Sequence, residues 1–315
     1  MQSKVKVLVL GATGGVGGEM MSALLAAGYE VKALSRNAQT PRAGVTWIKG
    51  DVMDRETVRK AAESVQFIFH GVNPPKYQNW ETLVIPMIEN TIYAAEKVGA
   101  RIILPGTIYN YGEGTAQPIT EDSPQRPSTK KGRVRVELES KLLEASQRGV
   151  RVLIVRAGDF FGPNKGSSWF SQAFVKPGLK VKSITNPGTK GKGHAWAYLP
   201  DLAATIVRVM DREADLSAFE LFHFGGHWDK DGTEMAKAIQ RAVGGDRVKI
   251  KGFPWFALPF IAPFSAVMRE ILEVRYLWKG EYRLDNAKLQ KFLGEEKHTD
   301  LDIAVRETLK GLGCV

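Results

Sequence analysis

Three glycines near the N-terminus have the types and spacing needed to bind a phosphate. Gly11, Gly14 and Gly17 follow an apolar run that starts at Val5 and precede a helix-favouring segment that starts at Glu19. Glycine lets the backbone turn tightly and approach a ligand closely. The N-terminus of the following helix offers unpaired N–H groups and the positive end of its dipole to an anion. The alternative, a glycine turn without a ligand, is disfavoured by the strand–turn–helix context.

The turn differs from the commoner dinucleotide fingerprint because its glycines follow Gly-x-x-Gly-x-x-Gly rather than Gly-x-Gly-x-x-Gly. We nevertheless expect it to hold the pyrophosphate of a dinucleotide. The residues expected to form this part of the site are Gly11, Thr13, Gly14, Gly15, Val16 and Gly17.

The end of the second predicted strand, Tyr29 to Asn37, indicates which dinucleotide is bound. An NAD-selective site has Asp or Glu there to accept from the ribose hydroxyls. This chain has Ser35 and Arg36 instead, a hydroxyl and a guanidinium that suit a 2′-phosphate. We therefore predict NADP, with NAD as the alternative. A solvated loop arginine is the competing interpretation of Arg36.

Strand-like and helix-like segments alternate over the first half of the chain. This alternation predicts βαβ units and an α/β fold with a doubly wound, mostly parallel sheet. In such a sheet a ligand binds beyond the carboxyl ends of the strands. The segments at those ends that we expect to contact the cofactor are Asp51 and Val52 after the third strand, and Gly71 and Val72 after the fourth.

Composition sets further bounds. The chain has 315 residues, a net charge of +10 and one cysteine, Cys314, which excludes an intramolecular disulfide. Its basic residues are dispersed among acids, so we expect no nucleic-acid partner. No histidine has metal-ligand spacing with carboxylates, and no metal is expected. Without a membrane-span pattern or a leader we expect a cytoplasmic protein with a small-molecule substrate.

The second half of the chain is less regular. We expect residues 1–165 to form the dinucleotide-binding domain and residues 166–315 a smaller substrate lobe, with a segment of about 194–224 returning to the first domain. Phe253 to Phe264 is very apolar and is interrupted by three prolines. We expect it to form a pocket wall or to cap the core, with contact to a membrane surface as the alternative.

Several motifs together resemble the extended short-chain dehydrogenase/reductase family, which contains nucleotide-sugar epimerases and dehydratases and related carbonyl reductases. The resemblance covers about the first 165 residues well and the tail more loosely. It rests on Gly11-Ala-Thr-Gly14-Gly-Val-Gly17, Gly50-Asp51-Val52, Asn90, Thr107, Tyr111-Gly112, Thr120-Glu-Asp, Arg156 followed by Gly162-Pro163, Tyr198-Leu-Pro-Asp201-Leu-Ala and Asn286-x-x-Lys-Leu-x-x-Phe-Leu-Gly294. It implies a Rossmann sheet of order 3-2-1-4-5-6-7, bound NAD(P) with Asn90 near the cofactor, and a homodimer through paired helices.

The family's catalytic Ser/Thr, Tyr and Lys are only partly present. Thr107 can fill the first role, but the helix after the fifth strand contains no tyrosine. One register reads Glu137 and Lys141 at the Tyr-x-x-x-Lys positions. The register we prefer reads Lys131 and Arg135, which lie on one helical face. Lys131 would polarise a carbonyl or act as an acid, and Arg135 would hold ribose hydroxyls or a phosphate.

Tyr109 and Tyr111 follow Thr107 and are expected to reach the nicotinamide region, where Tyr111 would offer a proton from another direction. A packed aromatic wall is the alternative for both. A solvated basic helix face is the alternative for Lys131 and Arg135. The leading functional hypothesis is an atypical NADP-dependent oxidoreductase that transfers a hydride to or from a small carbonyl or alcohol. The alternatives are a nucleotide-sugar epimerase or dehydratase, and a non-catalytic NAD(P)-binding redox sensor.

Overall fold

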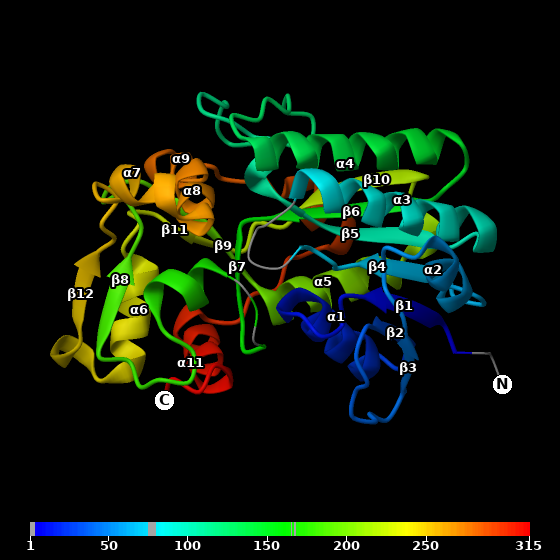
Figure 1. The fold of residues 1–315 in the computed structure, drawn as a ribbon, viewed down its shortest axis with the longest axis horizontal. Coiled ribbons are helices and arrows are strands. Elements are labelled where there is room, and N and C mark those ends of the chain that lie inside the picture. The colour runs from blue at the N-terminus through cyan, green and yellow to red at the C-terminus, as the bar shows by residue number, and fades with distance from the viewer. Residues whose placement is uncertain (1–3, 75–79, 165, 167) are drawn as a thin grey trace.

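The computed structural model describes residues 4–74, 80–164, 166 and 168–315. A seven-stranded sheet forms its centre, in the order β3-β2-β1-β4-β5-β6-β10 (Figure 1). All neighbouring strands in this sheet are parallel. The predicted Rossmann order is thereby confirmed, with the segment Phe219–His223 as its seventh strand.

The strands are β1 Lys6–Leu10, β2 Glu30–Ser35, β3 Val45–Lys49, β4 Phe67–His70, β5 Arg101–Thr107, β6 Val152–Ala157, β7 Asp159–Phe161, β8 Ser183–Asn186, β9 His194–Tyr198, β10 Phe219–His223, β11 His227–Asp229 and β12 Lys249–Gly252. The α-helices are α1 Gly15–Ala26, α2 Arg55–Ala61, α3 Trp80–Val98, α4 Lys130–Gln147, α5 Leu199–Met210, α6 Glu234–Val243, α7 Leu258–Ile261, α8 Ala266–Glu273, α9 Tyr276–Lys279, α10 Ala287–Leu293 and α11 Leu301–Gly311.

The two faces of the central sheet are both covered, which explains its almost continuously apolar strands. In β1, Val7 and Val9 belong to one core cluster while Leu8 and Leu10 belong to the other. Successive side chains of a strand point to opposite faces, so both sets must be apolar when both faces are buried. Helices α1 and α5 pack together on one face, and α2, α3 and α4 cover the other (Figure 1).

The glycine-rich turn is held by close backbone approaches that exclude side chains. Gly11 has a φ of 88°, and a Cβ on it would lie 2.6 Å from the carbonyl oxygen of Gly71. A Cβ on Gly17 would lie 2.2 Å from the carbonyl oxygen of Gly11. The turn therefore joins β1, the start of α1 and the segment after β4 at van der Waals distance, as the sequence pattern predicts for a Rossmann turn.

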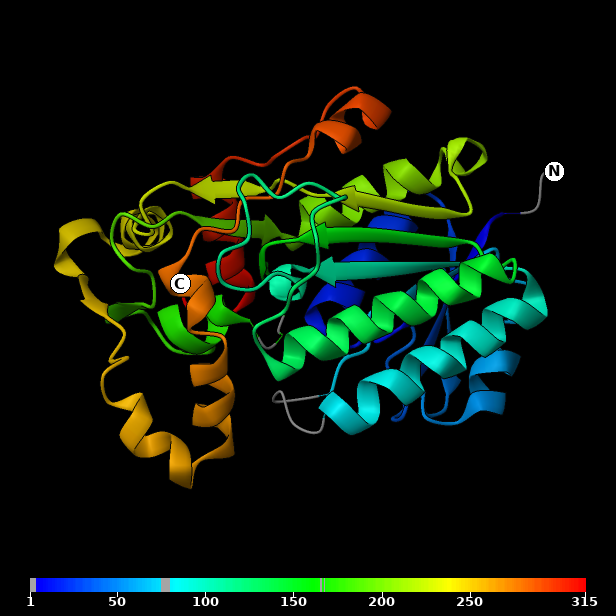
Figure 2. The same cartoon turned by 90° about the horizontal axis from the view of Figure 1, so that it is seen from above.

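The remaining elements form a lobe beside the carboxyl ends of the central strands (Figures 1 and 2). Strands β7, β9 and β11 make a small mixed sheet, and β8 pairs in parallel with β12. Helix α6 packs against α11 at the far side of this lobe. Helix α5 and strand β10 return from the lobe to the central sheet, where α5 packs on α1 and β10 extends β6.

The apolar segment from Phe253 to Phe264 is mostly exposed, so the expectation that it caps the core is wrong. Only Leu258 and Ala262 within it are fully buried, whereas Phe256, Phe260 and Phe264 are 79%, 78% and 90% exposed. Its three prolines prevent a long helix that could bury the whole segment, because proline lacks the N–H and clashes with the preceding turn.

The packing at the glycine-rich turn leads to a stability prediction. We expect Gly17→Ala to lower the free energy of unfolding by about 1–3 kcal/mol, because its methyl group overlaps the carbonyl of Gly11 and forces the backbone to shift. Gly252→Ala is the matched control, since a Cβ there meets nothing within 4 Å. Urea unfolding of both variants measures the difference, and equal stabilities would contradict the packing described here.

Candidate functional site

A cavity of about 370 Å³ lies beyond the carboxyl ends of β1, β4 and β5. Its wall combines the glycine-rich turn, the segment after β4, the end of β5, one side chain of α4, and β7 with the loop that follows it. The described residues that line it are Gly14, Gly15, Val16, His70, Gly71, Val72, Asn73, Pro74, Trp80, Pro105, Thr107, Tyr109, Arg135, Phe160, Phe161, Gly162, Asn164, Gly166, Ser168, Ser171, Leu199 and Leu312.

Arg135 is the positive charge that α4 presents to this cavity. Its Nη2 donates to Oδ1 of Asn73 over 3.2 Å, and its guanidinium carbon lies 4.7 Å from the ring centroid of Trp80. These contacts hold the planar guanidinium in one orientation. The structure thus brings Arg135 together with Thr107 and the glycine-rich turn in the wall of one cavity.

His70 closes the cavity at the end of β4 as a neutral imidazole. Burial, with a contribution from the charge of Arg135, lowers the pKa of His70 to about 3. The hydroxyl of Thr91 donates to the carbonyl of Met87, so it accepts from Nδ1 of His70, 2.8 Å away. That hydrogen bond sets the tautomer with the proton on Nδ1.

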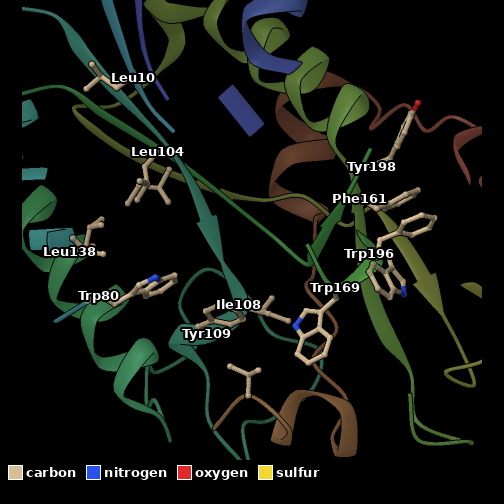
Figure 3. Packing of buried hydrophobic residues seen from close by; sticks show 14 of the residues in the cluster. Leu10, Trp80, Leu104, Ile108, Tyr109, Leu138, Phe161, Trp169, Trp196 and Tyr198 are labelled. Carbon is tan, nitrogen blue, oxygen red and sulfur yellow. The ribbon is translucent and has the colours of Figure 1, made fainter. Parts of the chain in front are cut away.

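Thr107 and Tyr109 stand side by side at the inner end of the cavity. Thr107 caps the short 3₁₀ turn Ile108–Asn110 that follows β5, because its hydroxyl oxygen accepts from the backbone N–H of Tyr109. Both residues also line a second, adjoining cavity of about 50 Å³, together with Asp159 and Trp169. Figure 3 shows Tyr109 with Trp80 and Trp169 around it. Tyr109 is therefore the tyrosine next to Thr107 in space.

Lys131 is buried but does not line either cavity. Its Nζ lies 2.5 Å from Oε2 of Glu270 and 3.7 Å from Oε2 of Glu273, both on α8. Glu273 also accepts from the backbone N–H groups of Lys130 and Lys131 at the start of α4. The expectation that Lys131 faces the substrate therefore differs from its observed position, because two carboxylates of the lobe bind its ammonium group.

Tyr111 lies beneath the site rather than in it. Its hydroxyl accepts from Nη1 of Arg156 at 2.5 Å and donates to Nε2 of His223 at 3.3 Å. Arg156 is also paired with Glu139 of α4, with Nη2 to Oε2 at 2.5 Å. Burial and the charge of Arg156 lower the pKa of His223 to about 3, so its imidazole is neutral. The hydroxyl of Tyr111 thus joins α4, β6 and β10, and the cavity wall does not include it.

Asp159 and His194 form a second buried pair in the lobe. The Nε2 atom of His194 lies 2.8 Å from Oδ2 of Asp159, and its ring stacks on Trp278 with a centroid separation of 3.9 Å. Asp159 borders the small cavity, whereas the pair as a whole is almost inaccessible. Among the described residues that line the small cavity, Asp159 is therefore the one with a carboxylate.

The residues expected around the adenosine half of a dinucleotide lie outside the cavity of about 370 Å³. Ser35 is half-buried at the end of β2 and the exposed Arg36 follows it; the Ser35 hydroxyl accepts from the side chain of Gln39. Asp51 is exposed and its carboxylate accepts from the N–H of Met53. Asn90 is buried and donates to the carbonyl of Val52 over 2.9 Å, which anchors the segment after β3. Gly11, Thr13 and Gly17 belong to the turn itself.

Several lining residues were not among the predicted site residues. The aromatic and polar side chains of this kind are His70, Asn73, Trp80, Phe160, Phe161, Asn164, Ser168 and Ser171. His70 could have been found from its place at the end of a predicted strand. The loop after β7 gave no periodic signal, so its contribution required the tertiary structure.

The chain matches a protein-family model over residues 7–225, described as the NAD-dependent epimerase/dehydratase family. The chain belongs to this family. The predicted resemblance is thereby confirmed.

Individual relatives are distant. UDP-glucose 4-epimerase of Bacillus subtilis (strain 168) is 22% identical over 278 residues, which cover 76% of this chain and 82% of the relative. UDP-glucuronic acid decarboxylase 1 of Xenopus tropicalis is 21% identical over 262 residues, which cover 77% of this chain but only 61% of that protein.

Solved structures show the same fold. A UDP-glucose 4-epimerase from Thermotoga maritima, solved with UDP-glucose, superposes with a TM-score of 0.76 at 17% identity and 98% coverage of both chains. The Bordetella bronchiseptica enzyme WbmH, solved with NAD⁺, gives a TM-score of 0.75 at 18% identity, again with 98% coverage of both chains.

Two features are absent from the part of the chain that the structure describes. None of the helices in that part of the chain is long and apolar enough to cross a membrane. No group of three or more His, Cys, Asp or Glu side chains there is arranged to hold a metal ion.

The buried neutral histidines predict an acid-sensitive fold. Because the folded pKa of His70 and of His223 lies near 3, below the usual 6.5, the unfolded chain binds protons that the folded chain does not. Stability contributed by keeping them neutral is complete above pH 6.5 and is lost as the pH falls toward 3. The slope is up to about 1.4 kcal/mol per pH unit for each histidine.

We expect His223→Gln to reduce this slope between pH 6.5 and 5, as measured by urea unfolding. His298→Gln is the control, because its pairing with Glu296 raises the pKa of His298 and gives the opposite sign. That variant should leave the slope unchanged or make it steeper. An unaltered slope in His223→Gln would contradict a neutral His223.

Proposed function

We propose that this protein is an NADP-dependent oxidoreductase that transfers a hydride to or from a small carbonyl or alcohol substrate. The observation that carries the proposal is the single cavity that joins the start of α1 to Thr107 and Arg135. A cofactor whose phosphates lie at the helix N-terminus and whose reactive end lies beside a hydroxyl is the ligand that such a cavity suits.

The residues present fit a nicotinamide dinucleotide. Gly14 and Gly15 present bare backbone to the cavity, and the first turn of α1 has no acidic side chain to repel a phosphate. The nicotinamide supplies or accepts the hydride when bound. Ser35 and Arg36 would hold the 2′-phosphate, because the end of β2 has no carboxylate that would favour a free ribose hydroxyl. The relatives solved with NAD⁺ set NAD as the alternative.

Thr107 and Tyr109 are the residues that we propose act on the substrate oxygen. The Thr107 hydroxyl would orient the oxygen by a hydrogen bond, and the Tyr109 phenol would give it a proton as the carbonyl is reduced. Tyr109 would thus occupy, from the strand end, the role that the family assigns to a tyrosine on the helix. Arg135, held by Asn73, would bind the ribose hydroxyls or a phosphate.

The space beyond Thr107 favours a small, uncharged substrate. The adjoining cavity measures about 50 Å³, and its described lining residues include Asp159 but no Lys or Arg. His194 binds that carboxylate, and the lining offers no Lys or Arg that could bind the diphosphate of a nucleotide sugar. The nucleotide-sugar reaction stays the alternative because the relatives named above carry such names. A redox sensor that binds the cofactor without turnover is the third.

Binding of the two cofactors tests the assignment of Arg36. We expect Arg36→Ala to weaken NADPH binding by about 10- to 100-fold, the loss of one charge-assisted pair, and to leave NADH binding unchanged. Calorimetry with both cofactors measures this. Arg148→Ala, which removes a surface arginine paired with Glu96 on α3, is the control. Tighter NADH binding by the unaltered chain would overturn the NADP assignment.

Turnover of NADPH with a panel of small aldehydes and ketones tests the catalytic assignment. We expect Tyr109→Phe to lower kcat by about 10²- to 10⁴-fold, the usual contribution of a general acid, without lowering thermal stability by much. Tyr111→Phe is the matched control and should mainly destabilise, by about 1–3 kcal/mol, because it removes a buried partner of Arg156. Cofactor binding without turnover of any substrate would favour the sensor.

A further inference from the structure

A group of exposed phenylalanines projects from the lobe, next to the paired strands β8 and β12 and the lysines on and before them. The apolar tip, as we call it here, consists of Phe256, Phe260, Ile261 and Phe264, which are 79%, 78%, 47% and 90% exposed. Figure 2 shows this gold-to-orange segment around α7 extending from the lobe at the lower left. Large aromatic side chains that are exposed close together mark an interaction surface, whereas hydrophobic residues exposed singly are normal on any protein.

The base of the apolar tip packs against the lobe. Leu258 and Ala262 alternate with the exposed residues and are buried, so one face of the segment packs while the other faces outward. Trp255 donates from its indole Nε1 to the carbonyl of Pro187 over 2.9 Å, and its ring packs on Phe253 with a centroid separation of 4.6 Å. The exposed rings are therefore presented by a fixed base.

The strands at the base of the tip carry cations on their surface. Lys249 and Lys251 lie on β12, and its partner β8 follows Lys180 and Lys182; all four side chains are exposed. The backbone N–H of Phe253 then donates to the carbonyl of Asn186, so the tip continues directly from this pair of strands. Every charged residue between positions 176 and 192, and between 247 and 269, is Lys or Arg.

Apolar rings surrounded by cations fit one occupant better than the others. In a two-fold dimer the same patch meets itself, which would bring Lys249 and Lys251 against the cations of the second copy. An anionic bilayer instead accepts the rings at the boundary between headgroups and acyl chains and attracts the lysines. We propose that the apolar tip, the lysines that precede β8 and the lysines of β12 dock this protein on the surface of an anionic membrane.

Docking of this kind needs no spanning helix and no change in the Rossmann domain. Burial of the rings supplies the apolar contribution, and each cation near the surface contributes about fivefold in affinity. The proposal does not depend on the cofactor or on the reaction, because it rests on exposed residues of the lobe.

Vesicle co-sedimentation of the full chain tests the proposal. We expect binding to vesicles of phosphatidylcholine that contain phosphatidylserine, little binding to phosphatidylcholine alone, and weaker binding at high salt. The triple variant Phe256→Ser, Phe260→Ser, Phe264→Ser should bind more weakly by about tenfold or more. Lys249→Gln with Lys251→Gln should lose about fivefold for each position.

Leu143→Ser is the control, because it removes an exposed leucine, 44% accessible, from α4 on the other domain. This variant should bind vesicles like the unaltered chain, and thermal melting should show every variant folded, since the altered side chains are exposed. Failure of the unaltered chain to sediment with anionic vesicles overturns the proposal. So does equal binding by the triple variant, or light scattering that shows a dimer which the triple variant dissociates.

Discussion

Three backbone segments meet in van der Waals contact at Gly11, Gly17 and Gly71, and the rest of the site depends on that contact. A Cβ at Gly11 or Gly17 would overlap a carbonyl oxygen, so the approach exists only because the side chains are absent. The contact aims the N-terminus of α1 at the cavity and places the end of β4 beside it. His70 and Asn73, and through Asn73 the guanidinium of Arg135, take their positions from this arrangement.

Helix α4 connects this turn to the lobe through three charged residues on one face. Lys131 pairs with Glu270 and Glu273 of α8, Arg135 reaches the cavity, and Glu139 pairs with Arg156 of β6 beneath the site. Residues four apart lie one above the other along a helix. Buried ion pairs contribute more to geometry than to net stability, because desolvation offsets most of their attraction. Together the contacts of these three residues fix the position of α4 relative to the lobe and to the central sheet.

The sheet order could be predicted because its signal is local and strong. Helices follow β1, β3, β4 and β5, the central strands are short and mostly apolar, and both faces of the sheet are buried, so neighbouring segments specify the βαβ unit. The lobe gave no such signal. Strands β7, β8, β9, β11 and β12 are three to five residues long and pair with segments far along the chain, so their pairing comes from long-range packing.

The amino-acid sequence by itself determined the glycine-rich turn, the parallel sheet and the absence of a tyrosine from the helix after β5, because each depends on residues close together in the chain. It also determined that Lys131 and Arg135 share a helix face. Only the tertiary structure decided their different surroundings, since Glu270 and Glu273 come from the far end of the chain to meet Lys131. It likewise placed Tyr109 rather than Tyr111 in the cavity wall, because Arg156 and His223 bind the hydroxyl of Tyr111.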